Sequence, residues 1–104
     1  MARLSYSQRA LQDLERLTDF LLASDPQAAL RTIDLIEEAV NILKRHPEIG
    51  RPVEDGLREL VISRGRSGYL ALYSFEQTHD ACLILAVRHQ REAGYPQEPD
   101  QPEE

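Results

Sequence analysis

The apolar positions in the first part of the chain predict a short strand followed by a helix. Leu4 and Tyr6 alternate with polar residues, which is typical of a strand. After Ser7 the spacing of the apolar residues changes to three and four, which places them on one face of a helix. The leucines of this face are Leu11, Leu14, Leu17 and Leu21. Ser7 is the expected N-cap, because its hydroxyl can accept a hydrogen bond from an unpaired N–H of the first turn.

A second helix is predicted after a break at residues 24–26. Asp25 is its expected N-cap and Pro26 its first residue, a position where proline loses no hydrogen bond. Its apolar face consists of Ala29, Ile33, Ile36, Val40 and Leu43. The helix should stop at His46-Pro47, because a residue before proline is pushed out of the α region. Two amphipathic helices joined by so short a break predict an antiparallel helical hairpin.

The second half of the chain predicts three strands. Residues 47–56 contain two prolines and two glycines and are predicted to form a loop. Residues 57–62, 69–75 and 81–87 are short runs rich in β-branched, aromatic and aliphatic side chains. Because the segments between these runs are short, the three strands should form an antiparallel meander.

Together these elements predict an α+β fold with the order β-α-α-β-β-β. Residues 81–87 are apolar at every position, which is expected of a strand with neighbours at both edges. We therefore predict a four-stranded antiparallel sheet in the order first, last, third, second, with the helical hairpin packed on one face. The antiparallel pairing of the first and last strands assumes that each element reverses the direction of the one before it. The other face of the sheet is left without a cover from this chain.

Charge divides the chain into a body and a tail. Its 104 residues suit a single domain. Five of the eighteen acids lie in the last thirteen residues, which contain no basic residue, so the first 91 residues carry thirteen acids and twelve lysines and arginines. We predict one folded domain over residues 1–92 and an acidic, proline-rich tail over residues 93–104. Because nucleic-acid-binding domains are usually basic, direct nucleic acid binding is not expected of this near-neutral body.

Other features bear on location and chemistry. No apolar run approaches the roughly 20 residues of a membrane span, and the first residues lack a signal-peptide core, so a cytoplasmic protein without membrane contact is expected. Cys82 is the single cysteine and lies in an apolar run, which favours a packing role. His46, His79 and His89 lie in different contexts, so no metal site is expected. No catalytic residue and no cofactor is predicted.

Basic and aromatic residues around the predicted sheet are the candidates for binding a partner, since arginine suits bidentate recognition of carboxylates and phosphates. These candidates are Arg51, Arg58, Arg64, Arg66, Tyr73, Arg88, His89 and Arg91. Residues 88–91 directly follow the buried strand, which favours binding, whereas Arg64 and Arg66 could equally be solvated turn residues. Tyr69 and Tyr73 share one strand face, which favours core packing; a surface for a partner is the alternative.

The order of several short motifs resembles the ParE toxin family of the ParE/RelE superfamily, the plasmid stabilisation system toxins. The motifs are Ser7-x-x-Ala10-x-x-Asp13-Leu14, the break at Pro26, His46-Pro47-x-x-Gly50-Arg51, Tyr69-x-x-x-Tyr73 and Val87-Arg88-His89-Gln90-Arg91. The resemblance covers residues 3 to about 95. It implies the fold predicted above and a cognate ParD-like antitoxin that folds on binding and wraps the toxin. It also implies toxicity through inhibition of DNA gyrase rather than through catalysis, with the candidate residues binding antitoxin or target.

Two alternatives stay open. The RelE branch, similar in fold, cleaves messenger RNA on the ribosome, which requires a base, an acid and cations at the scissile phosphate. Residues 69–76 contain no basic side chain and Lys44 is the only lysine, which favours ParE, although His89, Arg91 and Tyr73 could form a partial set. The second alternative is a non-toxic binding module of the same fold.

Overall fold

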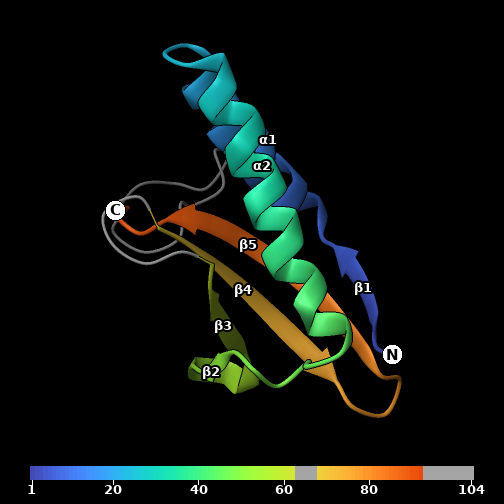
Figure 1. Ribbon diagram of the computed structural model, residues 1–104. Coiled ribbons are helices and arrows are strands. Elements are labelled where there is room, and N and C mark those ends of the chain that lie inside the picture. Colours follow the sequence, from blue (N-terminus) through green and yellow to red (C-terminus); the bar gives the residue numbers. More distant parts are fainter. Residues whose placement is uncertain (63–67, 93–104) are drawn as a thin grey trace.

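The computed structural model describes residues 1–62 and 68–92, which form two helices, two short 3-10 helices and five strands (Figure 1). In chain order the elements are β1 (Arg3–Tyr6), α1 (Gln8–Leu22), α2 (Pro26–Asn41), η1 (Ile42–Lys44), β2 (Arg51–Pro52), η2 (Glu54–Gly56), β3 (Arg58–Val61), β4 (Tyr69–Glu76) and β5 (Ala81–His89). The predicted strand, helical hairpin and meander are therefore confirmed. The predicted tail, residues 93–104, lies outside the described residues.

Both predicted helix caps are present. The hydroxyl of Ser7 accepts a hydrogen bond of 3.0 Å from the backbone N–H of Ala10. The carboxylate of Asp25 accepts bonds from the backbone N–H groups of Gln27 and Ala28, and Pro26 is the first residue of α2. Each cap satisfies N–H groups that have no partner within the helix, so both helix starts are encoded locally.

The sheet has five strands in the order β1-β5-β4-β3-β2. The predicted order of the four longer strands is confirmed, with β5 in a central position. The fifth strand, β2, was predicted to be loop; it pairs antiparallel with β3, with Arg51 opposite Glu59 and Pro52 opposite Arg58. A proline is tolerated there because β2 is an edge strand.

The predicted antiparallel pairing of β1 with β5 is wrong, because these two strands run parallel, with Leu4 opposite Cys82 and Tyr6 opposite Ile84. The error lies in the assumption that α1 reverses the direction of β1. Only Ser7 separates the two elements, and its backbone is extended, with φ −70° and ψ 164°. A single extended residue makes no turn, so α1 continues in the general direction of β1 (Figure 1).

The N-terminal part of α1 continues along the edge of β5 where β1 ends. The hydroxyl of Ser7 donates a hydrogen bond of 3.1 Å to the carbonyl oxygen of Leu85, and the backbone N–H of Val87 donates one of 2.9 Å to Oδ2 of Asp13. Asp13 is only 5% exposed. A buried backbone N–H requires a partner, and here a helix side chain takes the place of a neighbouring strand.

This arrangement changes which residues of α1 face the core. The buried positions of α1 are Ala10, Asp13 and Leu17. The predicted leucine stripe is correct for Leu17 but wrong for Leu11, which is exposed. The buried face is therefore rotated from the stripe, because Asp13 must reach the edge of β5.

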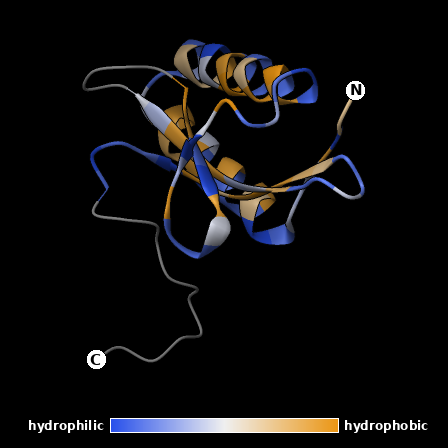
Figure 2. Ribbon diagram, turned by 90° about the horizontal axis from the view of Figure 1, so that it is seen from below, coloured by the Kyte–Doolittle hydropathy of each residue, from blue (hydrophilic) through white to orange (hydrophobic). Residues whose placement is uncertain are grey.

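The core lies between the helical hairpin and one face of the sheet. Ile36, Val40 and Leu43 from the second helical segment are fully buried against Tyr73 and Ile84 of the sheet. In Figure 2 the long paired strands are largely orange and the turn that joins them is blue, as expected of a buried hairpin with a solvated turn. Cys82 is also buried, which confirms its packing role. Within the described residues, no helix is long and apolar enough to cross a membrane.

Candidate functional site

The structure separates the predicted binding residues into two groups. Arg51, Arg58 and Tyr73 lie around the loop that follows the helical hairpin. Residues 88–91 lie at the opposite end of the sheet, where β5 ends. Arg64 and Arg66 lie outside the described residues.

The first group holds the loop of residues 47–50 against the sheet. Tyr73 is fully buried, and its hydroxyl donates a hydrogen bond of 2.8 Å to the carbonyl oxygen of Pro47 while accepting one of 2.9 Å from the N–H of Gly50. A Cβ atom at Gly50 would lie 2.6 Å from the Tyr73 ring, so the close approach requires glycine. Burial raises the pKa of Tyr73 above its ordinary value, which keeps the donating proton in place.

The two arginines of this group are also engaged within the protein. Nη1 of Arg58 donates to the carbonyl oxygens of Gly50, at 2.8 Å, and Glu48, at 3.0 Å. Nε of Arg51 donates at 3.0 Å to the carboxylate of Glu59, which is 5% exposed. We call Pro47, Gly50, Arg58 and Tyr73 the loop clamp. The motifs His46-Pro47-x-x-Gly50-Arg51 and Tyr69-x-x-x-Tyr73 thus meet in one structural unit.

The core interpretation of the two tyrosines is confirmed, since Tyr69 is 7% and Tyr73 0% exposed. This burial bears on the partial nuclease set. Tyr73 is paired with Ile84, whereas His89 is paired with Tyr69, so the hydroxyl of Tyr73 is not beside His89. The structure does not bring Tyr73, His89 and Arg91 together.

The second group is organised by Glu92, a residue that the sequence reasoning assigned only to the excess of acids near the C-terminus. Oε2 of Glu92 accepts a hydrogen bond of 2.8 Å from the N–H of His89, and the carbonyl oxygen of Glu92 accepts one of 2.6 Å from Nη1 of Arg88. The N–H of Arg91 donates to Nδ1 of His89 at 3.0 Å. These bonds close a turn over residues 89–92 at the end of β5.

Arg16 of α1 joins this turn to the helical hairpin. Its Nη1 lies 2.9 Å from Oε1 of Glu92, 76 residues away in the chain, and its Nη2 lies 3.6 Å from Oδ1 of Asp13. Sequence reasoning missed Arg16, because it lies among other charged residues on a solvated helix face. The only available signal was its i, i+3 spacing from Asp13, which is common on helices.

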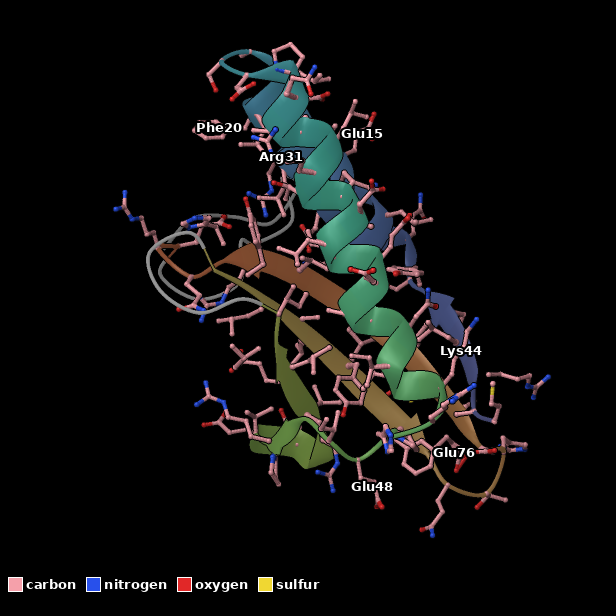
Figure 3. All side chains as sticks on the ribbon, in the orientation of Figure 1. Glu15, Phe20, Arg31, Lys44, Glu48 and Glu76 are labelled. Carbon is pink, nitrogen blue, oxygen red and sulfur yellow. The ribbon has the colours of Figure 1, made fainter. Side chains whose placement is uncertain are left out.

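A groove of about 790 Å³ lies between the hairpin and this end of the sheet. Its apolar lining comes from Leu17, Phe20, Leu21, Ala28, Leu35 and Tyr69. Among the described residues that line it, three are arginines, Arg16, Arg31 and Arg91, and Glu92 is the only acid. Figure 3 shows Phe20 and Arg31 on one side of the hairpin, with Glu15 on the other. We call this site the arginine groove.

The composition of the arginine groove suits a protein segment with apolar and acidic side chains. Phe20 is 75% exposed, which is unusual for a large aromatic residue without a partner. The rings of Tyr69 and His89 pack edge to face, with their centroids 5.1 Å apart, so His89 is held beside the apolar lining. Within residues 1–62 and 68–92, no cluster of His, Cys, Asp and Glu could hold a metal ion.

Comparison with known proteins gives the family. Residues 4–94 match the family described as the ParE toxin of the type II toxin–antitoxin system parDE. Toxin RelE3 of Caulobacter vibrioides is 37% identical over 92 residues, which are 88% of this chain and 98% of that protein. Toxin RelE1 of the same organism is 40% identical over 67 residues, 64% of this chain and 72% of that protein.

One solved structure supports the same assignment, and a second shares the fold. A chromosomal ParDE toxin–antitoxin system from P. aeruginosa superposes with a TM-score of 0.71 at 26% identity, covering 86% of this chain and 96% of that one. The toxin–antitoxin complex RelBE2 from Mycobacterium tuberculosis, at 20% identity and a TM-score of 0.56, shares the fold; the match covers 88% of this chain and 93% of that one. The chain belongs to the ParE toxin family of type II toxin–antitoxin systems.

Proposed function

We propose that this toxin acts in the cytoplasm by inhibiting DNA gyrase and is neutralised by a cognate antitoxin that binds the arginine groove. The observation that carries the proposal is the groove itself, in which three arginines lie beside an apolar lining that includes an exposed phenylalanine. Such a surface offers an apolar anchor site and charges for the carboxylates of a partner. The similar ParDE and RelBE2 structures are toxin–antitoxin systems, which supports a partner of this kind.

The outer face of the sheet provides a second contact surface for the antitoxin. Leu83 is 37% exposed and lies opposite Ser74, on the face away from the core residues Tyr73 and Ile84. An antitoxin segment that folds on binding would cover this apolar surface as well as the groove.

Antitoxin binding is tested with full-length toxin and the protein encoded by the neighbouring gene. We expect a stable complex, and we expect Arg31→Ala and Arg91→Ala each to weaken it about tenfold, as for residues at the centre of an interface. Arg45→Ala is the matched control, because Arg45 is exposed but does not line the groove. Equal effects at all three arginines would place the antitoxin elsewhere.

Gyrase inhibition is favoured over RNA cleavage because Tyr73, one of the three residues that could form a partial nuclease site, lies apart from the other two, His89 and Arg91. Tyr73 is buried in the loop clamp, and the sheet position opposite His89 is occupied by Tyr69. Purified toxin should therefore inhibit gyrase supercoiling and leave messenger RNA intact on programmed ribosomes. Inhibition that is relieved by the antitoxin would support the proposal.

Ribosome-dependent cleavage of messenger RNA is the second candidate. One observation favours it: the relatives from Caulobacter vibrioides are named RelE toxins. His89 and Arg91 line one groove with Arg16 and Arg31, and these could contact a phosphate. Cleavage of ribosome-bound messenger RNA that is lost in His89→Ala, with no effect on gyrase, would establish this candidate and refute gyrase inhibition.

A further inference from the structure

The carboxylate of Glu92 forms an ion pair with Arg16, one of the arginines that line the arginine groove. Oε1 of Glu92 lies 2.9 Å from Nη1 of Arg16, and Oε2 accepts the N–H of His89 at 2.8 Å. Both oxygens are thus engaged, one with the hairpin and one with the turn after β5. The side chains remain partly accessible, at 40% exposure for Arg16 and 26% for Glu92.

This ion pair has the character of a contact that a partner can replace. Ion pairs that keep contact with water contribute little to stability, so a second carboxylate can compete for the same guanidinium. Arg16 has Leu17 beside it in the groove lining, and Arg31 and Arg91 line the same groove. An acidic segment seated on the apolar lining would therefore bring its carboxylates to Arg16.

We propose that Arg16 is the carboxylate-recognition residue of the groove and that Glu92 is its internal competitor. The inference rests on the proposed function, since the competing carboxylate belongs to the antitoxin. When an antitoxin carboxylate binds Arg16, Glu92 loses its ion pair with Arg16, and this ion pair connects the turn of residues 89–92 to α1. Antitoxin binding and the presentation of His89 and Arg91 are then coupled through one side chain.

The competition predicts an effect opposite in sign to that of a merely structural contact. In full-length toxin, Glu92→Gln should bind the antitoxin on the order of threefold more tightly, because the internal competitor is gone. Arg16→Gln should bind about tenfold more weakly, because hydrogen bonds to charged groups are the stronger ones. The glutamine oxygen can still accept the N–H of His89, so the turn keeps that bond. Affinity is measured by titration calorimetry with the purified antitoxin.

Two further variants separate competition at Arg16 from general effects of charge. Glu15→Gln removes the same charge from an exposed position next to Arg16 in the sequence, on the other side of the hairpin from Phe20, and should leave affinity unchanged (Figure 3). In the double variant Arg16→Gln/Glu92→Gln, removal of Glu92 should give no tightening relative to Arg16→Gln alone. This cycle isolates the interaction between the two residues.

Each outcome decides the proposal. Unchanged or weaker binding by Glu92→Gln would overturn it, as would equal tightening by Glu15→Gln or tightening that persists without Arg16. If Glu92→Gln lowers the thermal stability of the toxin, the comparison of Arg16→Gln with the double variant still tests it, because Arg16 is absent from both. Failure of the wild-type toxin to bind any antitoxin would refute the proposed function itself, which is a different result from binding without the predicted change.

Discussion

The loop clamp and the arginine groove are built from the same residue types and use them in opposite ways. In the clamp, Arg58 and Tyr73 are bonded to backbone atoms of the loop they hold, and Tyr73 is fully buried. In the groove, arginines lie beside an apolar lining that includes the exposed ring of Phe20. The difference teaches that an arginine or tyrosine near a sheet indicates a binding site only when nearby backbone carbonyl groups do not already accept its hydrogen bonds. Variants in the two regions should therefore affect different measurements.

The largest expected effect is in the loop clamp. Gly50→Ala should lower the free energy of unfolding by about 3 kcal/mol, at the upper end for overpacking in a rigid site, because the new Cβ would lie 2.6 Å from the Tyr73 ring. Chemical denaturation measures the loss. Adding Tyr73→Phe should recover part of it, since Phe lacks the hydroxyl that lies 2.7 Å from the same Cβ position. Additive losses in the double variant would show that the contact with the Tyr73 hydroxyl is not part of the cause.

Removal of the Asp13 carboxylate should have the second-largest effect on the free energy of unfolding. Asp13→Ala leaves the N–H of Val87 without its acceptor, which should lower the free energy of unfolding by about 2 kcal/mol. Asp13→Asn keeps an oxygen at this position and should lose less. Hydrogen exchange should show faster exchange at Val87 in Asp13→Ala than in the asparagine variant; equal exchange in the two would mean that the carboxylate oxygen is not the required acceptor.

A smaller effect, on binding alone, is expected in the groove. Phe20→Ala should change the unfolding free energy by less than about 0.5 kcal/mol, because the ring is 75% exposed, yet weaken antitoxin binding about tenfold. Leu30→Ala is the control, since Leu30 is 69% exposed on α2 and does not line the groove. A similar loss of affinity in both variants would remove the distinction between groove and general apolar surface.

The smallest expected effect is the pH dependence of stability, which arises from partly or fully buried side chains such as Tyr73 of the loop clamp. Burial raises the pKa of Cys82 above 9.0 and the pKa values of Tyr6 and Tyr73 above 10.0. The folded state holds these protons more tightly than the unfolded state, so stability should fall as pH rises from about 9. Denaturation at a series of pH values should show a shallower fall in Tyr73→Phe. A rise in stability over this range would contradict the assigned direction.

Much of the fold follows from local features of the sequence. Period-four and period-three spacing, the caps at Ser7 and Asp25, and the apolar run at residues 81–87 were enough for the two helices, the four longer strands and the order of those strands. Such features can be recognised in a sequence because each depends on residues a few positions apart. The two-residue strand β2 could not be recognised in this way, since it has no periodic pattern of its own and is a strand only through its pairing with β3, where Arg51 lies opposite Glu59.

The candidate site was predictable only in part. The sequence pointed to residues 88–91 as a surface at the end of the central strand, and four arginines with Tyr73 were proposed alongside them on residue type alone. Two of those arginines, Arg51 and Arg58, are engaged with Glu59 and with the loop backbone. Whether a polar side chain meets a partner within its own chain depends on contacts between distant segments, which composition does not reveal.

The sequence by itself determined the two helices and their caps, the four longer strands and the centre of the sheet, because these arise from short-range periodicity and burial. The tertiary structure decided the parallel direction of β1, the burial of Asp13 and the pairing of Arg16 with Glu92. Each of these depends on α1 continuing past β1 along the edge of β5. That path brings residues more than 70 positions apart into hydrogen-bond contact, and it places the groove where neither segment alone would form one.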